Sequence, residues 1–198
     1  MSLDKINDTS LIGIEGHIKI WDPESGEVLV RRRNAINYEN MSIAIASLLA
    51  NEAGNTGTHS IATMRFGNGG TTIDGLGTVT YKATNTNSSS GALYNQTYSQ
   101  AVDEAVTGSA LNGTEVNHTA PNTYSDVITT CTLDFDSVTG EDATDTATNM
   151  NGTYVFDELA IYSGNNDLLT HFVFHPVQKS ENRKIQVIYT LRIRSSFA

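Results

Sequence analysis

The sequence predicts a mainly β protein: an antiparallel β-sandwich of jelly-roll type with one short amphipathic helix at about residues 38–52. The first observation behind this prediction is composition, because Thr, Asn, Ser and Gly are abundant and favour turns and exposed strand faces over helix interiors. The second is that apolar side chains occupy every second position of residues 184–194, the period of a strand with one buried face. The third is that a convincing helical period occurs only once.

The N-terminal part is expected to form a β-hairpin over residues 13–36. The turn sequence Asp-Pro-Glu-Ser-Gly at 22–26 separates two strand-like runs. In the first run, three isoleucines share one face of the strand: Ile14, Ile18 and Ile20.

The helix is expected directly after this hairpin. Asn37 or Asn40 can cap its first turn, since a side-chain oxygen there can accept a hydrogen bond from a free backbone NH. Its apolar residues recur at i, i+3, i+4, i+7 and i+8, which gives one face that packs on a sheet: Met41, Ala44, Ile45, Leu48 and Leu49.

Further strands are expected at 61–66, 127–135, 154–162, 168–174 and 184–194, with weaker candidates at 78–83 and 94–102. Residues 180–183 are interpreted as the turn of a final hairpin between the last two strands. The chain is therefore expected to be a single domain, residues 1–198. Its ends form the sandwich, and a loop-rich polar and acidic insertion lies at about 67–152.

Charge is unevenly distributed along the chain. The net charge is −10, and no Lys or Arg occurs between Lys82 and Lys179, a stretch that carries twelve acids. An acidic chain is a poor general binder of nucleic acid, so no nucleic-acid partner is expected. No secretory signal and no apolar run of about 20 residues is visible, so no membrane partner is expected either.

Several short motifs suggest chemistry, but each favours a structural interpretation. The Gly-rich residues 67–72 lack the Gly-Lys-Ser/Thr ending of a phosphate loop, so a tight turn with positive φ angles is expected. His171 and His175 lie about 13 Å apart on an extended strand, too far to share a metal. The lone cysteine, Cys131, lies in a strand-like run and is expected to be a buried structural thiol.

The acidic residues give no catalytic pattern. Asp134, Asp136, Gly140 and Asp145 fail the spacing of a calcium loop, and a solvated acidic loop is the default. Adjacent acids at 157–158 point to opposite faces of a strand and make a poor acid/base pair. We therefore expect no enzyme activity, no catalytic residues, no bound metal and no cofactor.

Three consecutive arginines, Arg31, Arg32 and Arg33, are the sharpest charge feature. On a strand the first and third share one face and the second takes the other. They are either a solvated edge or an ion-pairing patch for an acidic partner surface, such as the middle of another copy. The expected interface residues are Arg31, Arg32, Arg33, Arg192, Arg194, Asp134, Asp136, Glu141, Asp142 and Asp145.

The order of short landmarks along the chain resembles a family of tailed-phage virion proteins, the tail-, neck- and baseplate-associated components seen in T4-like marine phages. The landmarks are residues 14–21 (IEGHIKIW), 25–27 (SGE), 34–37 (NAIN), 61–71 (IATMRFGNGGT), 156–162 (FDELAIY), 168–179 (LLTHFVFHPVQK) and 185–193 (IQVIYTLRI). The resemblance implies a non-enzymatic, multicopy structural role in the virion, after synthesis in the host bacterial cytoplasm. Its partners would be other virion proteins and copies of itself.

Two other functions remain open at this point. A capsid (head) decoration protein would also be structural but would bind a capsid lattice. A host-glycan-binding module of a tail fibre would use exposed tyrosines, Trp21 and the Asn-rich loops, although the sequence shows no clustered aromatic platform. The expectation is an assembly protein of the tail, neck or baseplate that forms homo-oligomers.

Overall fold

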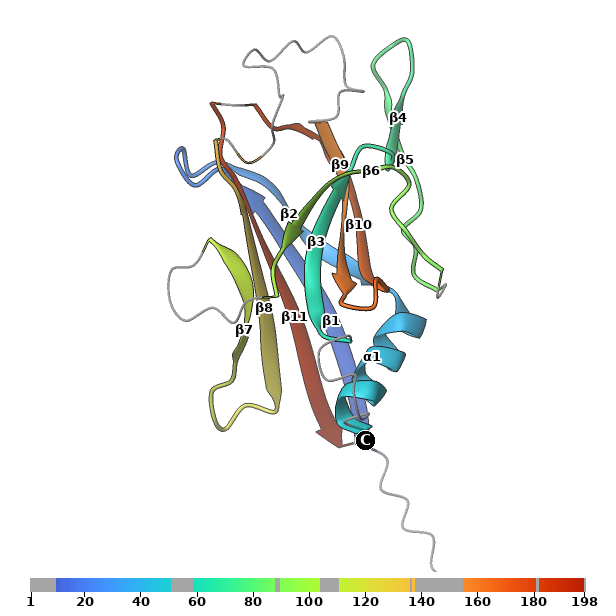
Figure 1. The fold of residues 1–198 in the computed structure, drawn as a ribbon, viewed down its shortest axis with the longest axis vertical. Coiled ribbons are helices and arrows are strands. Elements are labelled where there is room, and N and C mark those ends of the chain that lie inside the picture. The colour runs from blue at the N-terminus through green and yellow to red at the C-terminus, as the bar shows by residue number, and fades with distance from the viewer. Residues whose placement is uncertain are drawn as a thin grey trace, which may run out of the picture.

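The computed structural model describes residues 10–50, 59–87, 90–103, 111–135, 137, 155–180 and 182–197. These form one large antiparallel sheet, a separate two-stranded hairpin and a single α-helix (Figure 1). The nine strands of the large sheet lie in the order β6 (Gln96–Ala101), β3 (Ile61–Gly67), β9 (Val155–Ser163), β10 (Leu168–Gln178), β2 (Val28–Ile36), β1 (Ser10–Trp21), β11 (Ile185–Phe197), β8 (Tyr124–Leu133) and β7 (Asn112–Asn117). The hairpin is β4 (Thr71–Ile73) with β5 (Val79–Tyr81), and the helix is α1 (Tyr38–Ala50).

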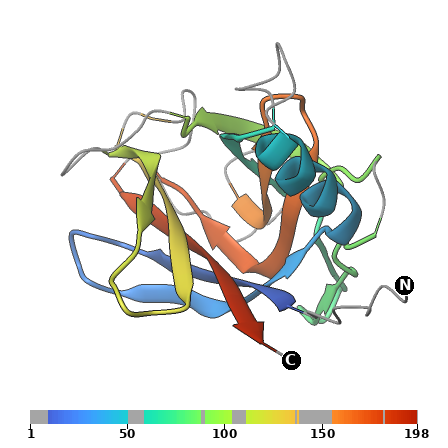
Figure 2. The same cartoon turned by 90° about the horizontal axis from the view of Figure 1, so that it is seen from below.

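The large sheet curls until its two halves face each other, as the view along the strands shows (Figure 2). Strand β2 belongs to both halves, because it pairs with β1 along most of its length and with β10 at Ala35 and Ile36. The edge strands β6 and β7 approach each other, and the hydroxyl of Thr114 donates to the carbonyl of Val102 at 2.9 Å. The sheet is thus nearly closed into a barrel. The predicted mainly β, antiparallel fold with one short helix is confirmed.

The main core lies between the two halves of the sheet. Strand alternation fills it, since every second residue of β1 and β11 points inward, as predicted for both strands. The most deeply buried core side chains include Ile18, Ile20, Met64, Phe66, Leu159, Ile161, Val187 and Tyr189. Cys131 is fully buried in the same core, which confirms the structural thiol.

Helix α1 begins where the sequence predicts it. The side chain of Asn37 accepts a hydrogen bond from the backbone NH of Asn40 at 3.1 Å, so Asn37 is the N-cap. The Asn40 side chain instead donates to the carbonyl of Leu168 at 2.9 Å and so ties the helix to β10. Met41 and Ala44 are buried beneath the helix, whereas Leu49 is 80% exposed.

The predicted final hairpin is wrong. A turn at Ser180 is present, where the backbone NH of Arg183 donates to its carbonyl, but β10 and β11 do not pair with each other. Instead, β10 lies between β9 and β2 in one half of the sheet, and β11 lies between β1 and β8 in the other. The connection therefore crosses from one half to the other.

The polar segment at 67–152 contributes more to the sheet than an insertion would. Its described residues include β6, β7 and β8, and β8 pairs with β11 over ten residue pairs. Strand β7 was not expected, because its sequence, Asn-Gly-Thr-Glu-Val-Asn, carries no apolar alternation. It is a strand because its backbone pairs with β8.

Candidate functional site

A groove of about 830 Å³ runs over the outer face of β1, β2, β11 and β8. We call it the basic groove. Among the residues that the structure describes, five Lys or Arg side chains line it against one acid, Asp126, in a chain whose net charge is −10. Its polar lining residues are His17, Lys19, Arg31, Arg32, Arg33, Asp126, Thr190 and Arg192.

Strand register brings these side chains together. Arg31 lies directly opposite Lys19, and Arg33 lies directly opposite His17, on the paired strands β2 and β1. Arg31 and Arg33 therefore share one face of β2, as predicted. Arg32, between them, lies opposite the buried Ile18. Arg32 is nevertheless exposed and also lines the basic groove.

The cations of the basic groove are unequally neutralised. Arg192 makes two 2.7 Å hydrogen bonds to Asp126, a bidentate pair that holds the pKa of the Asp126 carboxyl below its ordinary value. Arg33 lies 3.7 Å from Glu15. The Lys19 ammonium lies 3.8 Å from the centre of the Trp21 ring. Among the described residues, neither Arg31 nor Arg32 has an ion pair, so these two are the least neutralised charges of the groove.

The other predicted interface residues are dispersed. Arg194, two residues after Arg192 on β11, is exposed and lies 6.0 Å from the ring of Tyr124. Asp134 is 3.2 Å from Lys184 of its own chain. The remaining acids, Asp136, Glu141, Asp142 and Asp145, lie outside the described residues.

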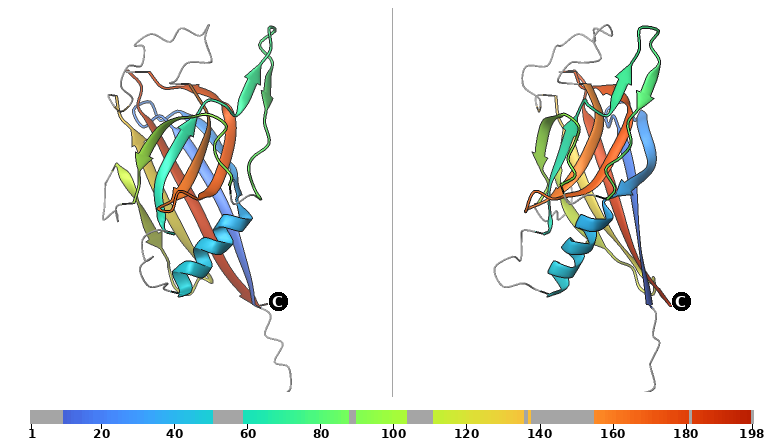
Figure 3. Two further views of the ribbon diagram at one scale, coloured as in Figure 1. Left: turned by 45° about the vertical axis from the view of Figure 1, so that its right-hand side comes forward. Right: turned by 90° about the vertical axis from the view of Figure 1, so that its right-hand side faces the viewer.

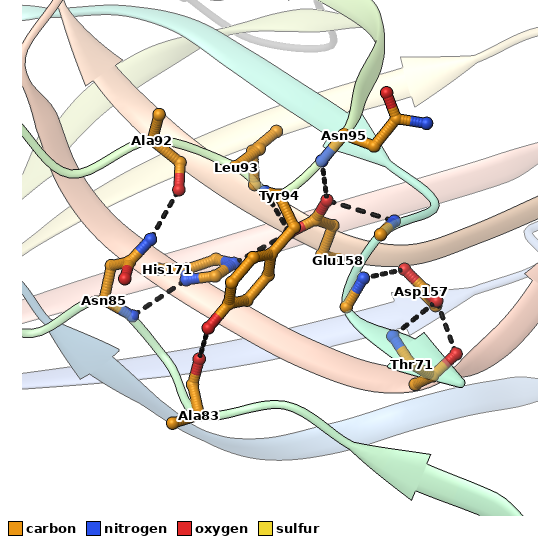
Figure 4. A network of polar contacts seen from close by, with 12 residues as sticks. Thr71, Ala83, Asn85, Ala92, Leu93, Tyr94, Asn95, Asp157, Glu158 and His171 are labelled. Carbon is orange, nitrogen blue, oxygen red and sulfur yellow. Dashed lines mark hydrogen bonds and ion pairs between the residues drawn. The ribbon is translucent and has the colours of Figure 1, made fainter.

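A second polar site is buried on β9 and β10 (Figure 4). Glu158 and His171 are both fully buried, and Glu158 Oε2 lies 3.1 Å from His171 Nε2. The Glu158 carboxylate also accepts hydrogen bonds from three backbone NH groups, at 2.8–3.2 Å, which belong to Gly69, Tyr94 and Asn95. Next to it, Asp157 accepts from the backbone NH groups of Gly70 and Thr71 and from the Thr71 hydroxyl.

The hydrogen bonds fix the protonation of this pair. The backbone NH of Asn85 donates to His171 Nδ1 at 2.9 Å, so Nδ1 carries no proton. His171 is therefore a neutral imidazole whose proton lies on Nε2 and is donated to the Glu158 carboxylate.

Burial and hydrogen bonds together lower the pKa of Glu158 but leave the pKa of Asp157 raised. Burial raises the pKa of Glu158, but the hydrogen bonds from His171, Asn95 and Tyr94 more than offset it, so the pKa is lowered and the group is ionised. Burial also raises the pKa of Asp157. There the hydrogen bonds from Thr71 and Gly70 offset only part of the effect, and the net shift is upward.

This buried polar cluster fastens loops to the sheet. Each backbone donor to Glu158, Asp157 or His171 comes from the segments 69–71, 85 or 94–95, which lie over β9 and β10 (Figure 4). Its carboxylates and imidazole are sealed from solvent and already satisfied, so the cluster stabilises the fold and offers a substrate no accessible reacting atom.

The Gly-rich segment 67–72 is part of this cluster. The prediction of positive φ angles there is wrong, since the described glycines with positive φ are Gly26, Gly77 and Gly113. Glycine is needed for close approach instead. A Cβ on Gly69 would lie 2.7 Å from the backbone nitrogen of Asn95, and one on Gly70 would lie 3.0 Å from the carbonyl oxygen of Asp157. The loop's NH groups thus bind carboxylates of its own chain.

The remaining candidates have structural surroundings. His175 lies 3.3 Å from the Tyr81 hydroxyl, away from His171, and burial raises the pKa of the Cys131 thiol. Within the described ranges, no group of three or more His, Cys, Asp or Glu side chains could hold a metal ion. The described part of the chain also contains no helix with the length and apolar character needed to cross a bilayer.

Comparison of the chain with protein-family models, with curated proteins and with solved structures gives no match.

The adjacent acids Asp157 and Glu158 give no catalytic pattern in the sequence, yet they organise a buried polar network. The signal was present in the sequence: two adjacent acids interrupt β9, whose nine residues are all buried. Acids in such a run need several donors to remain ionised. The donors themselves are backbone NH groups of distant loops, which residue identities do not reveal.

Proposed function

We propose that the chain is a non-enzymatic, multicopy structural subunit of a tailed-phage virion. It acts in the tail, the neck or the baseplate, where it binds copies of itself and other virion proteins. The single observation that carries the assembly role is the basic groove, and the landmark order of the sequence supports the virion setting.

The register of β1 and β2 places like charges together in the basic groove, which destabilises an isolated subunit. Like charges placed directly opposite each other on neighbouring strands destabilise a sheet, and Lys19 lies opposite Arg31. A carboxylate-rich surface bound in the groove would neutralise both cations. The groove therefore suits a protein surface that is completed by an acidic neighbour.

Copies of this chain can supply such a neighbour. The chain has 22 acids against 12 Lys and Arg, and its long stretch without basic residues carries twelve of the acids. A contact between two different surfaces of identical subunits is heterologous and generates rings or helical arrays, the arrangements found in multicopy particles.

The location is tested by mass spectrometry of heads and tails separated from purified particles of the phage that encodes this chain. The proposal expects the chain in the tail fraction, which includes the neck and baseplate. Recovery from heads alone would establish the capsid decoration alternative instead. Absence from both fractions, together with glycan binding by a monomer, would overturn the structural role.

A further inference from the structure

The β4–β5 hairpin projects from one end of the molecule, opposite the end where α1 lies (Figures 1 and 3). Its tip carries Leu76, which is 94% exposed, the highest exposure among the large apolar side chains that the structure describes. Single exposed leucines are common on surfaces, but this one is held at the end of a projecting hairpin. It is placed to contact another molecule.

The tip is held rigidly. The Asp74 carboxylate accepts hydrogen bonds from the backbone NH groups of Leu76 and Thr78 at 2.9 and 2.8 Å. Gly77 donates its NH to the carbonyl of Asp74 and has a φ of 83°, a conformation that glycine adopts without strain. A preorganised tip loses little conformational freedom when it binds.

The base of the hairpin is anchored as well. Thr71, the first residue of β4, is hydrogen-bonded to the buried Asp157, and the backbone NH of Lys82 donates to the carbonyl of Gly70 at 2.8 Å. The Tyr81 hydroxyl lies 3.3 Å from His175 on β10. The buried polar cluster therefore fixes the direction in which Leu76 projects.

The opposite end of the molecule has an apolar groove of about 440 Å³ between α1 and the start of β1. We call it the helix groove. Three of its lining side chains are largely exposed: Ile12 at 61%, Tyr38 at 67% and Leu49 at 80%. Among the rest are Ile14, Ile36, Met41 and Ile45, and none of the described residues that line it is charged. Apolar surface of this kind marks protein contact sites.

We propose that the helix groove of one copy receives the β4–β5 tip of the next copy, with Leu76 inserted beside Leu49. The chemistry agrees, since one apolar side chain enters a groove whose described lining residues are uncharged. A second groove lies on the other side of α1, but Asp103 and His59 line it, and an inserted leucine would desolvate them.

The contact is head-to-tail. The β4–β5 hairpin, which carries Leu76, and α1, which lines the helix groove, lie at opposite ends of the molecule, so one subunit can use both surfaces at once (Figure 3). A heterologous contact of this geometry propagates into a ring or a helical array. The inference rests on the proposed multicopy role and adds a second, apolar contact to the charged one.

The test uses the chain of residues 1–198 with Leu76→Asp or Leu49→Asp, studied by sedimentation velocity at about 0.5 M NaCl, where charged contacts are largely screened. Both residues are exposed in the monomer, so neither change should unfold it. Each variant alone should dissociate at least about tenfold more readily than the wild type. Leu111→Asp, at a leucine that is 52% exposed outside the groove, should assemble like the wild type.

Mixing the two variants gives the decisive result. The Leu49→Asp copy keeps its tip and the Leu76→Asp copy keeps its groove, so the mixture should form dimers that cannot grow further. A monomeric wild type, a single variant that assembles normally, or a mixture without dimers would overturn the inference. If the chain is found in particles while these variants assemble normally, the inference fails and the proposed function stands. If dimers form as expected but the chain is absent from particles, the proposed function fails and the contact stands.

Discussion

Glu158 and His171 form a fully buried pair, with Oε2 of the acid 3.1 Å from Nε2 of the imidazole. The pair joins β9 to β10, since Glu158 lies opposite Val173, two residues from His171. It also holds the loop segments at 69, 85 and 94–95 against these strands. One ionised carboxylate thus positions the surface from which the β4–β5 hairpin projects.

Replacing Glu158 with Gln should destabilise the fold by about 2–4 kcal/mol. The amide would turn an NH₂ group toward the NH donors that now meet a carboxylate oxygen, leaving buried donors unsatisfied. Urea unfolding measures the loss. Glu115→Gln, at an exposed position of β7, is the matched control and should change stability by less than about 0.5 kcal/mol. Equal effects of the two changes would contradict the role assigned to Glu158.

The stabilisation that Glu158 gives relative to Gln at the same position should depend on pH. Its folded-state pKa is lowered from the ordinary 4.5, so its stabilisation is fully present above pH 4.5 and is lost as the pH falls through the folded pKa. The raised pKa of Asp157 acts in the opposite direction, but Asp157 is present in both proteins. The difference in unfolding free energy between wild type and Glu158→Gln should therefore shrink in acid. A difference that grows below pH 4.5 would contradict a lowered pKa of Glu158 in the folded state.

Asp157→Asn should loosen the base of the β4–β5 hairpin. One carboxylate oxygen accepts from the Thr71 NH and hydroxyl, and an amide nitrogen in its place would face both donors. We expect a cost of about 1–3 kcal/mol. Hydrogen exchange should show faster exchange at the NH groups of Gly70 and Thr71, with β1 and β11 unchanged. Unchanged protection at both NH groups would contradict the anchoring role.

Gly69→Ala should destabilise the protein by about 1–3 kcal/mol, because the new methyl group would lie 2.7 Å from the Asn95 nitrogen and 2.8 Å from Tyr94 Cβ. Gly75→Ala is the control. A Cβ there meets nothing within 4 Å, and the hairpin should tolerate it. Thermal unfolding of both variants measures the contrast, and equal midpoints would rule out the close packing of this loop.

The local parts of the fold could be predicted from sequence. The β1–β2 hairpin depends on a turn sequence between two strands, and the helix start depends on the Asn37 cap, both within a few residues. Pairing between distant strands could not be predicted. Alternation in β11 shows that one face is buried, but it does not distinguish β10 from β1 and β8 as its neighbours.

The candidate sites likewise combine local features, which the sequence predicts, with long-range pairing, which it does not. That Arg31 and Arg33 share a face follows from strand period alone. The position of Lys19 opposite Arg31, which destabilises an isolated subunit, depends on register across the hairpin. The Glu158–His171 pair depends on two strands and three loops, so only the isolated acids in an apolar strand could indicate it.

The proposed function depends on the basic groove as a contact between subunits. Sedimentation velocity of the wild type, Arg31→Ser and Lys82→Ser at about 0.05 and 0.5 M NaCl tests it directly, because charged contacts weaken as screening increases. Lys82 is exposed and lies outside the groove, so its loss removes the same charge elsewhere. We expect wild type and Lys82→Ser to associate more strongly at low salt, and Arg31→Ser to lose this salt-dependent part. Association of Arg31→Ser that matches the wild type at low salt would contradict the claim.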